Sequence, residues 1–397
     1  MHEQGGVESP ARPVEDVTWD PHDPRVLQDQ RSAYDEMRRR CPVAHSGVMG
    51  WSLFRHADVT MVTGDPGAFS SATRRLAIPN GMDPPEHAHY RGSLEPYFTS
   101  DRLTAFEPRS RQIARHLLTA IVDGDHVEMI GEFVDPFAHQ ALCAFMGWPV
   151  EDWNRISGWT HGNLDAAFRS DREAGARLAR EFTAYVSEIL RARHAQRSSN
   201  DLMSDLIRVT VHGEALSDEQ IVRLLRTWTA GHGTVAAALG IVIRYLAEDV
   251  ALQTRLRSEP DLIEAAIWEI LRTDGPLVSN TRTASQDVEI GGRAIRAGER
   301  ISLMWIAANR DPATFTDPEH VILDRGIDDN LLFGAGIHRC LGESLAIQNL
   351  RVAVDELLQH IARFEFVAPS APPRSVYPSN GLRELPLRLG PTAMSNR

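Results

Sequence analysis

The chain has 397 residues, and its 42 lysine and arginine residues against 54 aspartate and glutamate residues give it a net charge of −12. This acidic balance argues against nucleic acid as a partner, because phosphate contacts require a basic surface. Hydrophobic residues make up 42% and charged residues 24% of the chain, which is typical of a globular protein. The length is sufficient for one large domain with a sizeable core.

Three cysteines, Cys41, Cys143 and Cys340, lie far apart in the sequence, and no C-x-x-C pair occurs. The chain therefore predicts neither a disulfide framework nor a thiolate zinc site, which favours a reducing compartment. Its N-terminus lacks the basic and apolar regions of a signal peptide, and apolar runs such as residues 235–243 are shorter than the roughly 20 residues of a membrane span. We expect a cytoplasmic monomer that contacts no membrane.

We predict a single domain over residues 21–390, because no repeat or linker divides this part of the chain. Residues 1–20 are rich in Pro, Glu and Asp and are expected to form a poorly ordered arm. Residues 391–397 are expected to form a short tail.

Most of the domain has a helical pattern, interrupted by a few short strands. Residues 51–54 alternate as a strand does, and residues 287–292 and 296–301 are predicted to pair as a hairpin through glycine turns. The fold class is therefore mainly α with a small β region.

A basic segment follows the turn at Asp83-Pro84-Pro85. His87 and Arg91 stand at positions i and i+4, which share one face of a helix. We expect this face to present two cations to an anionic group. A solvated surface pair is the alternative interpretation.

The clearest helices are residues 171–196 and 217–247. The second opens with Ser217-x-x-Gln220, a capping box. At about 1.5 Å per residue, its roughly 30 residues are long enough to cross the whole molecule.

The long helix carries the motif T-A-G-H-G-T at residues 229–234. Each glycine inside a helix costs about 1 kcal/mol relative to alanine, so two of them indicate a local reason. We predict a bend at Gly231 and Gly233 that frees the Thr234 hydroxyl to point into a pocket. Close packing of the helix against another backbone is the alternative.

Glu269 and Arg272 are three residues apart and share a helical face. Taken alone, they suggest a surface ion pair worth about 0.3–0.5 kcal/mol.

The segment FGAGIHRCLG at residues 333–342 surrounds Cys340 with the features that a thiolate ligand requires. Gly334 and Gly336 permit a tight loop whose amides face the sulfur. A helical pattern follows Cys340, and the dipole at its N-terminus would lower the pKa of the thiol. Gly342 leaves room beside the sulfur for a flat group. Without these neighbours, Cys340 would be interpreted as an inert buried residue.

This loop, F-G-x-G-x-H-x-C-x-G, resembles the cysteine loop of the cytochromes P-450, which are haem-thiolate monooxygenases. Within the family, the expected lack of a membrane anchor resembles the bacterial class. The resemblance implies the cytochrome P-450 fold, with haem b between the helix at residues 217–247 and the helix after Cys340, and with Cys340 as the iron ligand. D-P-P-E-H-x-x-x-R, A-G-x-x-T, E-x-x-R and the A-N-R-D-P segment at residues 308–312 extend the resemblance from about residue 51 to residue 387. The cofactor contacts that it implies are His87, Arg91, Ala230, Arg282, Phe333, Gly334, His338, Cys340 and Gly342.

Two positions depart from the family pattern. Gly233 stands where the family has the acidic residue of its proton relay, and His320 stands where P-x-R-F has the arginine that joins the pair corresponding to Glu269 and Arg272. Thr234 matches the threonine that manages proton delivery, so Thr234, His232 and ordered water are the candidate proton carriers. The helical phase of His232 favours the alternative that its side chain points away from the haem. The missing acid leaves both hydroxylation and oxidative coupling open.

The resemblance also implies where the substrate pocket lies, because segments at corresponding positions line it in the family. These segments are residues 71–82, 165–170, 225–235, 277–280 and 377–382. The candidate lining residues are Ile78, Pro79, Phe168, Thr229, Ala230, Val278, Ser279, Asn280, Ser379 and Asn380. The polar ones favour a functionalised natural product, although a role as turn residues explains them equally well.

The resemblance implies an oxidoreductase that monooxygenates a small substrate of secondary metabolism with electrons from NAD(P)H. The electrons would arrive through a ferredoxin reductase and a ferredoxin, because the chain leaves no sequence for a flavin or iron–sulfur domain. An acidic ferredoxin would dock near Arg339, with Arg102, Arg109 and Arg111 as further contacts.

Other functions remain as alternatives. The first is radical C–C or C–N coupling of a bulky substrate without oxygen transfer. The others are a peroxide-driven enzyme and, from another class, a haem-binding sensor or transport protein.

Overall fold

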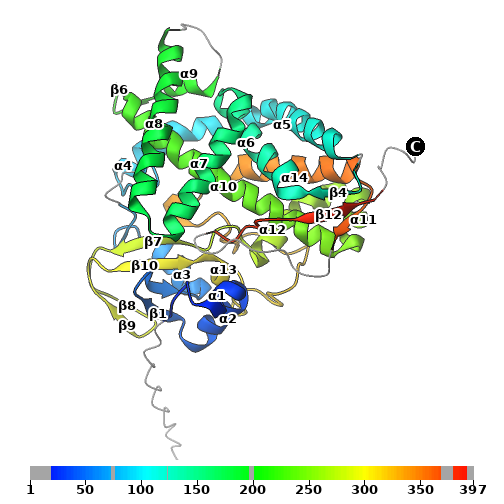
Figure 1. The fold of residues 1–397 in the computed structure, drawn as a ribbon. Coiled ribbons are helices and arrows are strands. Elements are labelled where there is room, and N and C mark those ends of the chain that lie inside the picture. The colour runs from blue at the N-terminus through cyan, green and yellow to red at the C-terminus, as the bar shows by residue number, and fades with distance from the viewer. Residues whose placement is uncertain (1–18, 73–76, 123, 196–200, 368–378, 391–397) are drawn as a thin grey trace, which may run out of the picture.

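The computed structural model describes residues 19–72, 77–122, 124–195, 201–367 and 379–390. Helices dominate, and a small β region lies at one end together with the N-terminal segment (Figure 1). Most of the predicted arm (residues 1–18) and the whole predicted tail (residues 391–397) lie outside the described residues. Trp19, at the end of that arm, is buried with its ring 5.2 Å from that of Phe54, so the arm is anchored there.

The helices form most of the molecule. They are α1 (Pro24–Gln28), α2 (Gln30–Arg40), α3 (His56–Gly64), α4 (Glu86–Leu94), α5 (Ser100–Ile121), α6 (Asp135–Met146), α7 (Trp153–Phe168), α8 (Arg172–Ala195), α9 (Leu202–Leu206), α10 (Asp218–Glu248), α11 (Val250–Ser258), α12 (Ile263–Thr273), α13 (Trp305–Ala308) and α14 (Glu343–His360). Shorter or wider helical turns are η1 (Glu95–Phe98), η2 (Ile130–Val134), η3 (Val150–Asp152), η4 (Pro260–Leu262) and η5 (Gly336–His338).

The strands are short. They are β1 (Val43–Ser46), β2 (Gly50–Leu53), β3 (Phe69–Ser70), β4 (His126–Glu128), β5 (Thr210–Val211), β6 (Glu214–Ala215), β7 (Ser279–Ala284), β8 (Val288–Ile290), β9 (Arg293–Ile295), β10 (Arg300–Met304), β11 (Phe364–Phe366) and β12 (Pro386–Leu389). The main sheet has the order β1-β2-β10-β7-β3, with β10 parallel to β2 and antiparallel to β7. A second sheet has the order β11-β12-β4.

The predicted hairpin is wrong in its second strand. Strand β8 pairs with β9, which begins directly after Gly291 and Gly292. Both glycines have positive φ angles, +58° and +76°, so the chain reverses at once. The segment expected to pair with β8 instead leads into β10 of the main sheet.

Helix α10 crosses the centre of the helical part (Figure 1) and organises the main core. Its capping box is present, with the Ser217 N–H donating to Gln220 at 2.8 Å and the Gln220 N–H donating to the Ser217 hydroxyl at 3.3 Å. Buried side chains of α5, α6, α10, α12 and α14 form one continuous cluster around it. By length and composition α10 could cross a membrane, but 67% of its most apolar window is buried inside the fold, as in a core helix.

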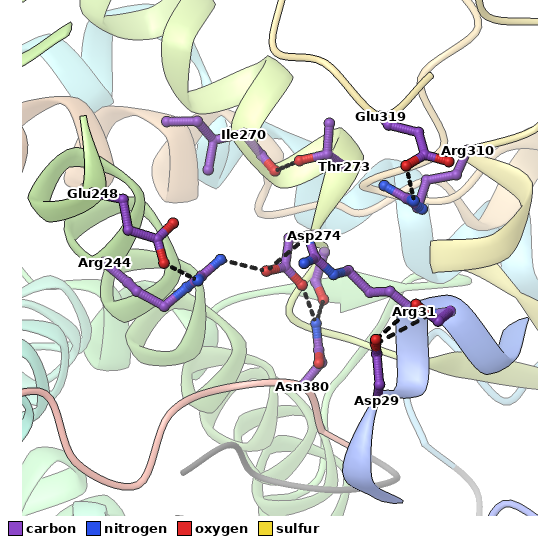
Figure 2. A network of polar contacts seen from close by, with 12 residues as sticks. Asp29, Arg31, Arg244, Glu248, Ile270, Thr273, Asp274, Arg310, Glu319 and Asn380 are labelled. Carbon is purple, nitrogen blue, oxygen red and sulfur yellow. Dashed lines mark hydrogen bonds and ion pairs between the residues drawn. The ribbon is translucent and has the colours of Figure 1, made fainter. Parts of the chain in front are cut away.

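A buried polar network ties this core to the C-terminal segment (Figure 2). Asp274, which follows α12 and is fully buried, accepts from Arg244 of α10 at 3.2 Å and from the Asn380 amide at 2.7 Å. Arg31 of α2 approaches the same carboxylate at 3.7 Å, and Arg244 also pairs with Glu248 at 2.6 Å. A buried carboxylate requires such partners, so the network fixes the end of α12 against three other segments.

Candidate active site

The loop before α14 holds Cys340 in a fixed place. Gly334 and Gly336 have φ angles of +72° and +67°, and a Cβ atom on Gly336 would collide with the Thr63 carbonyl group of α3. The Cys340 N–H donates to the Phe333 carbonyl oxygen at 2.9 Å and closes the loop. Two residues of the predicted glycine framework are thus required by backbone geometry.

The Cys340 thiol lies in a recess at the start of α14. Its side chain is reachable by solvent, although it is surrounded by protein atoms. Desolvation raises the pKa of the thiol, whereas the Gly342 N–H, which hydrogen-bonds to the sulfur, and the nearby Arg91 and Arg339 lower it. A metal ion would complete the stabilisation of the thiolate. Gly342 leaves space here, because a Cβ atom on it would lie 3.9 Å from its nearest neighbour, Phe98.

Unpartnered nitrogen atoms gather near this recess. The rings of His87 and His338 lie 4.3 Å apart, and His87 Nε2 and both His338 ring nitrogens are buried without a hydrogen-bond partner. Burial lowers the pKa of His338 to about 4, with Arg282 and His87 adding charge repulsion. Burial likewise lowers the pKa of Arg282, whose guanidinium donates to the Thr281 carbonyl oxygen at 3.0 Å. Buried polar groups of this kind are expected to have hydrogen-bond partners, which an anionic group bound here would supply.

The residues present fit haem. Its two carboxylates would supply the acceptors that the His87 and His338 ring nitrogens lack and would also accept from Arg282, and the exposed Cys340 sulfur would bind its iron. Phe333, which the sequence also predicted at the cofactor, packs its ring 5.2 Å from that of Trp268.

Arg91 has a role that the sequence did not reveal. Its guanidinium donates to the Arg339 carbonyl oxygen at 2.6 Å and pairs with Glu95 at 3.1 Å. Arg91 therefore links α4 to the residue next to Cys340 and supports the cysteine loop directly.

The predicted release of the Thr234 hydroxyl from its own backbone is not observed. Helix α10 continues through residues 229–234, and the Thr234 hydroxyl donates to the Gly231 carbonyl oxygen at 2.6 Å instead of pointing away from its own backbone. A threonine hydroxyl without another acceptor bonds the carbonyl of the preceding turn.

The two pocket candidates of this segment differ in exposure. Thr229 is fully buried, and its hydroxyl donates to the Leu225 carbonyl oxygen at 2.7 Å, so its assignment to the pocket is wrong. Ala230 is exposed.

Close packing between α10 and α7 explains the glycine at position 233. A Cβ atom at this position would lie 2.5 Å from the Thr160 methyl group of α7. The alternative interpretation of the motif, close packing against another element, therefore applies to this glycine. The side chain of Thr160 fills the place that an acidic side chain would need.

The Glu269–Arg272 pair is fully buried and belongs to the fold. Arg272 contacts Glu269 at 2.6 and 3.1 Å and donates to the carbonyl oxygens of Asn309, Pro318 and His320 at 2.8–3.0 Å. The His320 carbonyl, not its imidazole, takes part. Arg325, missed in the sequence, supplies the second guanidinium to Glu269 at 3.0 Å.

Several predicted pocket residues are structural. Val278 is buried in a core cluster with Tyr34, Phe54 and Met304, so its placement in the pocket is wrong. The Asn380 amide is committed to Asp274 and Gly275, and this assignment is also wrong. Ser379 accepts from the Gly381 N–H at 3.3 Å, as a turn residue does.

Five further candidates of the predicted pocket are Asn280, Ser279, Ile78, Pro79 and Phe168. Asn280 accepts from the Trp305 indole at 2.9 Å, and Ser279 is half-buried on β7. Ile78 and Pro79 are buried, and the ring centroid of Phe168 lies 5.3 Å from that of His22. None of these contacts places the residue against a bound molecule.

An open cavity of about 1390 Å³ lies between α7, α8 and α10 and reaches Ala230. Trp159, Asn163 and Val222 line it together with small residues such as Ala166 and Ala176. The sequence did not lead us to expect that α8 lines this cavity. The run of small residues facing α10 was the available signal.

A family model for cytochrome P-450 matches residues 152–388 of this chain. The chain belongs to the cytochrome P-450 family. It is 32% identical over 350 residues to the cyclomarin C epoxidase CymV of Salinispora arenicola. The aligned residues cover 83% of this chain and 88% of the relative. It is also 32% identical over 346 residues to the erythromycin C-12 hydroxylase of Saccharopolyspora erythraea, over 82% of this chain and 86% of the relative.

Solved structures agree with this assignment. A mutant of P-450 EryK in complex with erythromycin B has a TM-score of 0.85 and 28% identity, and covers 92% of this chain and 97% of that chain. The predicted P-450 fold is confirmed, and the protein is a P-450 monooxygenase whose family binds haem through a cysteine thiolate.

Replacing His87 with alanine should weaken haem retention by about 1.5–3 kcal/mol, the value of a charge-assisted hydrogen bond. The side chain is buried and its Nε2 atom has no protein partner. The rate of haem transfer to apomyoglobin measures retention. His89→Ala, an exposed histidine on the same helix, is the control. Equal haem transfer from both variants would contradict a contact between His87 and a propionate.

Proposed function

We propose that this P-450 hydroxylates or otherwise monooxygenates a functionalised natural product, with electrons from NAD(P)H delivered by a ferredoxin reductase and a ferredoxin in the cytoplasm. The unpartnered ring nitrogens of His87 and His338, with the desolvated Arg282 and the accessible Cys340 thiol, carry the haem part of the proposal. The substrate class is supported by relatives named for the epoxidation of cyclomarin C and the hydroxylation of erythromycin.

The chain's own residues have distinct tasks in this reaction. When bound, haem would supply the activation of dioxygen, and the Cys340 thiolate would hold its iron. Ala230, exposed at the inner end of the cavity, leaves room for substrate beside α10. The Thr234 hydroxyl can rotate away from Gly231 and hold a proton for the reaction.

The ferredoxin would meet the face around the cysteine loop. Arg109 of α5 is exposed, and its side chain donates to Gln112 at 2.7 Å. Arg111 is a weaker candidate than the sequence indicated, because Glu107, Asp355 and Glu356 neutralise it. Arg339 pairs with Glu343 at 2.7 Å and would have to exchange partners.

The products under labelled dioxygen test the proposal. Candidate natural products are first screened for the low-spin to high-spin shift of the haem, and those that bind are turned over with NADPH, ferredoxin and reductase under ¹⁸O₂. We expect the product to gain one labelled oxygen atom. Turnover with hydrogen peroxide alone would instead indicate a peroxide-driven enzyme. Ligand binding without any turnover would indicate a sensor or transport protein.

Oxidative coupling is the second candidate, and the open cavity of about 1390 Å³ favours it because two aromatic units can fit. A coupled or desaturated product without label would establish it in place of oxygen transfer. The haem-thiolate assignment would stand in either case.

A further inference from the structure

The cavity between α7, α8 and α10 has largely apolar walls. Trp159 of α7 lines it, and because its indole N–H already donates to the Leu178 carbonyl oxygen at 2.9 Å, the ring presents apolar atoms to the cavity. Val222 and Ala166 also line it and are buried. Walls of this kind suit the apolar body of an organic ligand.

Neutral polar side chains on these walls bond within their own helices. Asn163, Thr183 and Thr227 line the cavity, and each donates to the carbonyl oxygen four residues earlier, at 2.7, 2.8 and 3.0 Å respectively. These donors are engaged, so polar recognition of a ligand depends mainly on the charged side chains of the walls.

The charged side chains include an unpaired guanidinium. Each of the three carboxylates among the described lining residues already has a partner within 3.0 Å. The pairs are Asp218 with His194, Glu219 with Arg223, and Asp171 with the N–H group of Ala174. Arg180 of α8 lines the same cavity and is exposed, and it forms no ion pair or side-chain hydrogen bond within the part of the chain that the structure describes. Its guanidinium is therefore open to an anionic ligand.

Arg226 places a second guanidinium on the α10 wall, near the inner end of the cavity. It is half-buried and stands four residues before Ala230, so the two residues share one face of α10 and lie about 6 Å apart along its axis. Ala230 is the lining residue that the family resemblance puts at the cofactor. His232, a candidate proton carrier, is buried and lies outside the cavity lining. An arginine keeps its charge in such a place and can bind both oxygens of a carboxylate.

We infer that the substrate carries a carboxylate, which Arg226 of α10 and Arg180 of α8 bind while the apolar body of the substrate lies against Trp159 and Ala230. The inference rests on the proposed function and deepens it, because it makes the natural product an acid that is oxidised on the Ala230 side of its carboxylate. A neutral analogue of the same shape would leave both guanidinium groups without this partner and should bind more weakly.

Matched acids and amides test the inference by binding alone. Dodecanoate, indolebutyrate and N-benzoylphenylalaninate are each compared with their primary amide, which has nearly the same shape, by isothermal titration calorimetry of the haem-containing protein. We expect at least one acid to bind about tenfold more tightly than its amide, the effect of one charge-assisted hydrogen bond. If no acid binds more tightly than its amide, the inference is overturned.

Arg226→Gln and Arg180→Gln test which residues bind the carboxylate. Each should lower the affinity for the acid and leave that for the amide unchanged, and the double variant should bind acid and amide equally. Arg177→Gln is the control, because Arg177 is an exposed arginine of α8 outside the cavity lining, and it should keep the preference for the acid. An undiminished preference in the double variant would overturn the inference.

Arg226→Lys replaces Arg226→Gln if that variant fails to fold. A lysine keeps the charge but lacks the planar fork, so the preference for the acid should fall only in part. With Arg180→Gln added, an unchanged preference would again overturn the inference.

Two further outcomes separate this inference from its neighbours. Dodecyl phosphate bound more tightly than dodecanoate through the same two arginines would assign the site to a phosphate ester and overturn the carboxylate. Product labelled from ¹⁸O₂ together with equal binding of acids and amides would overturn this inference alone. A preference for the acid without any labelled product would contradict the proposed function and leave the carboxylate site standing.

Discussion

Replacing Cys340 with serine should abolish oxygenase turnover while leaving the polypeptide folded. The loop around it is held by glycine conformations and by the Cys340 N–H bond to Phe333, both of which serine retains. Because the side chain is exposed, the free energy of unfolding of the haem-free protein should change by no more than about 0.5 kcal/mol. A serine hydroxyl cannot replace the electron donation of a thiolate. NADPH-dependent turnover and thermal unfolding measure the two effects.

Cys143→Ser is the matched control for this substitution. Cys143 is buried on α6, where desolvation raises the pKa of its thiol to about 12, so it stays protonated and takes no part in ligation. Turnover should survive in this control. Turnover that also survived in Cys340→Ser would show that another residue holds the iron.

Replacing Arg272 with leucine should lower the free energy of unfolding by about 3–5 kcal/mol, because it leaves the Glu269 carboxylate buried with an incomplete set of partners. Arg272 is fully buried and also donates to three backbone carbonyls of the segment at residues 309–320. Arg325 remains beside Glu269 and prevents a larger loss. Urea unfolding of the haem-free protein measures the difference.

Arg39→Leu, an exposed arginine of α2, is the control and should stay within about 0.5 kcal/mol of the wild type. A loss of only about 0.5 kcal/mol for Arg272→Leu would mean that the pair behaves as a solvated surface pair. Glu269→Gln keeps the shape of the side chain and removes only its charge. This substitution should therefore lower the free energy of unfolding less than Arg272→Leu does.

Local patterns in the sequence predicted the parts of the site that depend on neighbours in the chain. The cysteine loop, the capping box at Ser217 and the helix carrying His87 follow from glycine conformations, capping and helical spacing. These features depend on residues only a few positions apart, so they can be recognised without knowledge of the tertiary structure.

Long-range packing decided the positions where sequence reasoning failed. Thr160 lies on another helix from Gly233, and Arg325 reaches Glu269 from a loop far along the chain. Val278 directly precedes strand β7, and its burial could be assigned only once the core around Tyr34 was known. Asn380 is polar and was expected near the pocket, but its side-chain amide donates a hydrogen bond to the buried Asp274. Contacts between distant segments leave no local signal in one sequence.

The absorption spectrum of the dithionite-reduced carbonyl complex of the purified protein tests the haem-thiolate assignment most directly. Thiolate ligation by Cys340, which lies accessible in its recess beside the unsatisfied His87 and His338, predicts a strongly red-shifted Soret band. The same band should be absent from Cys340→Ser. A Soret band at the position typical of histidine-ligated haem in the wild type, or a red-shifted band that persists in Cys340→Ser, would contradict Cys340 as the iron ligand.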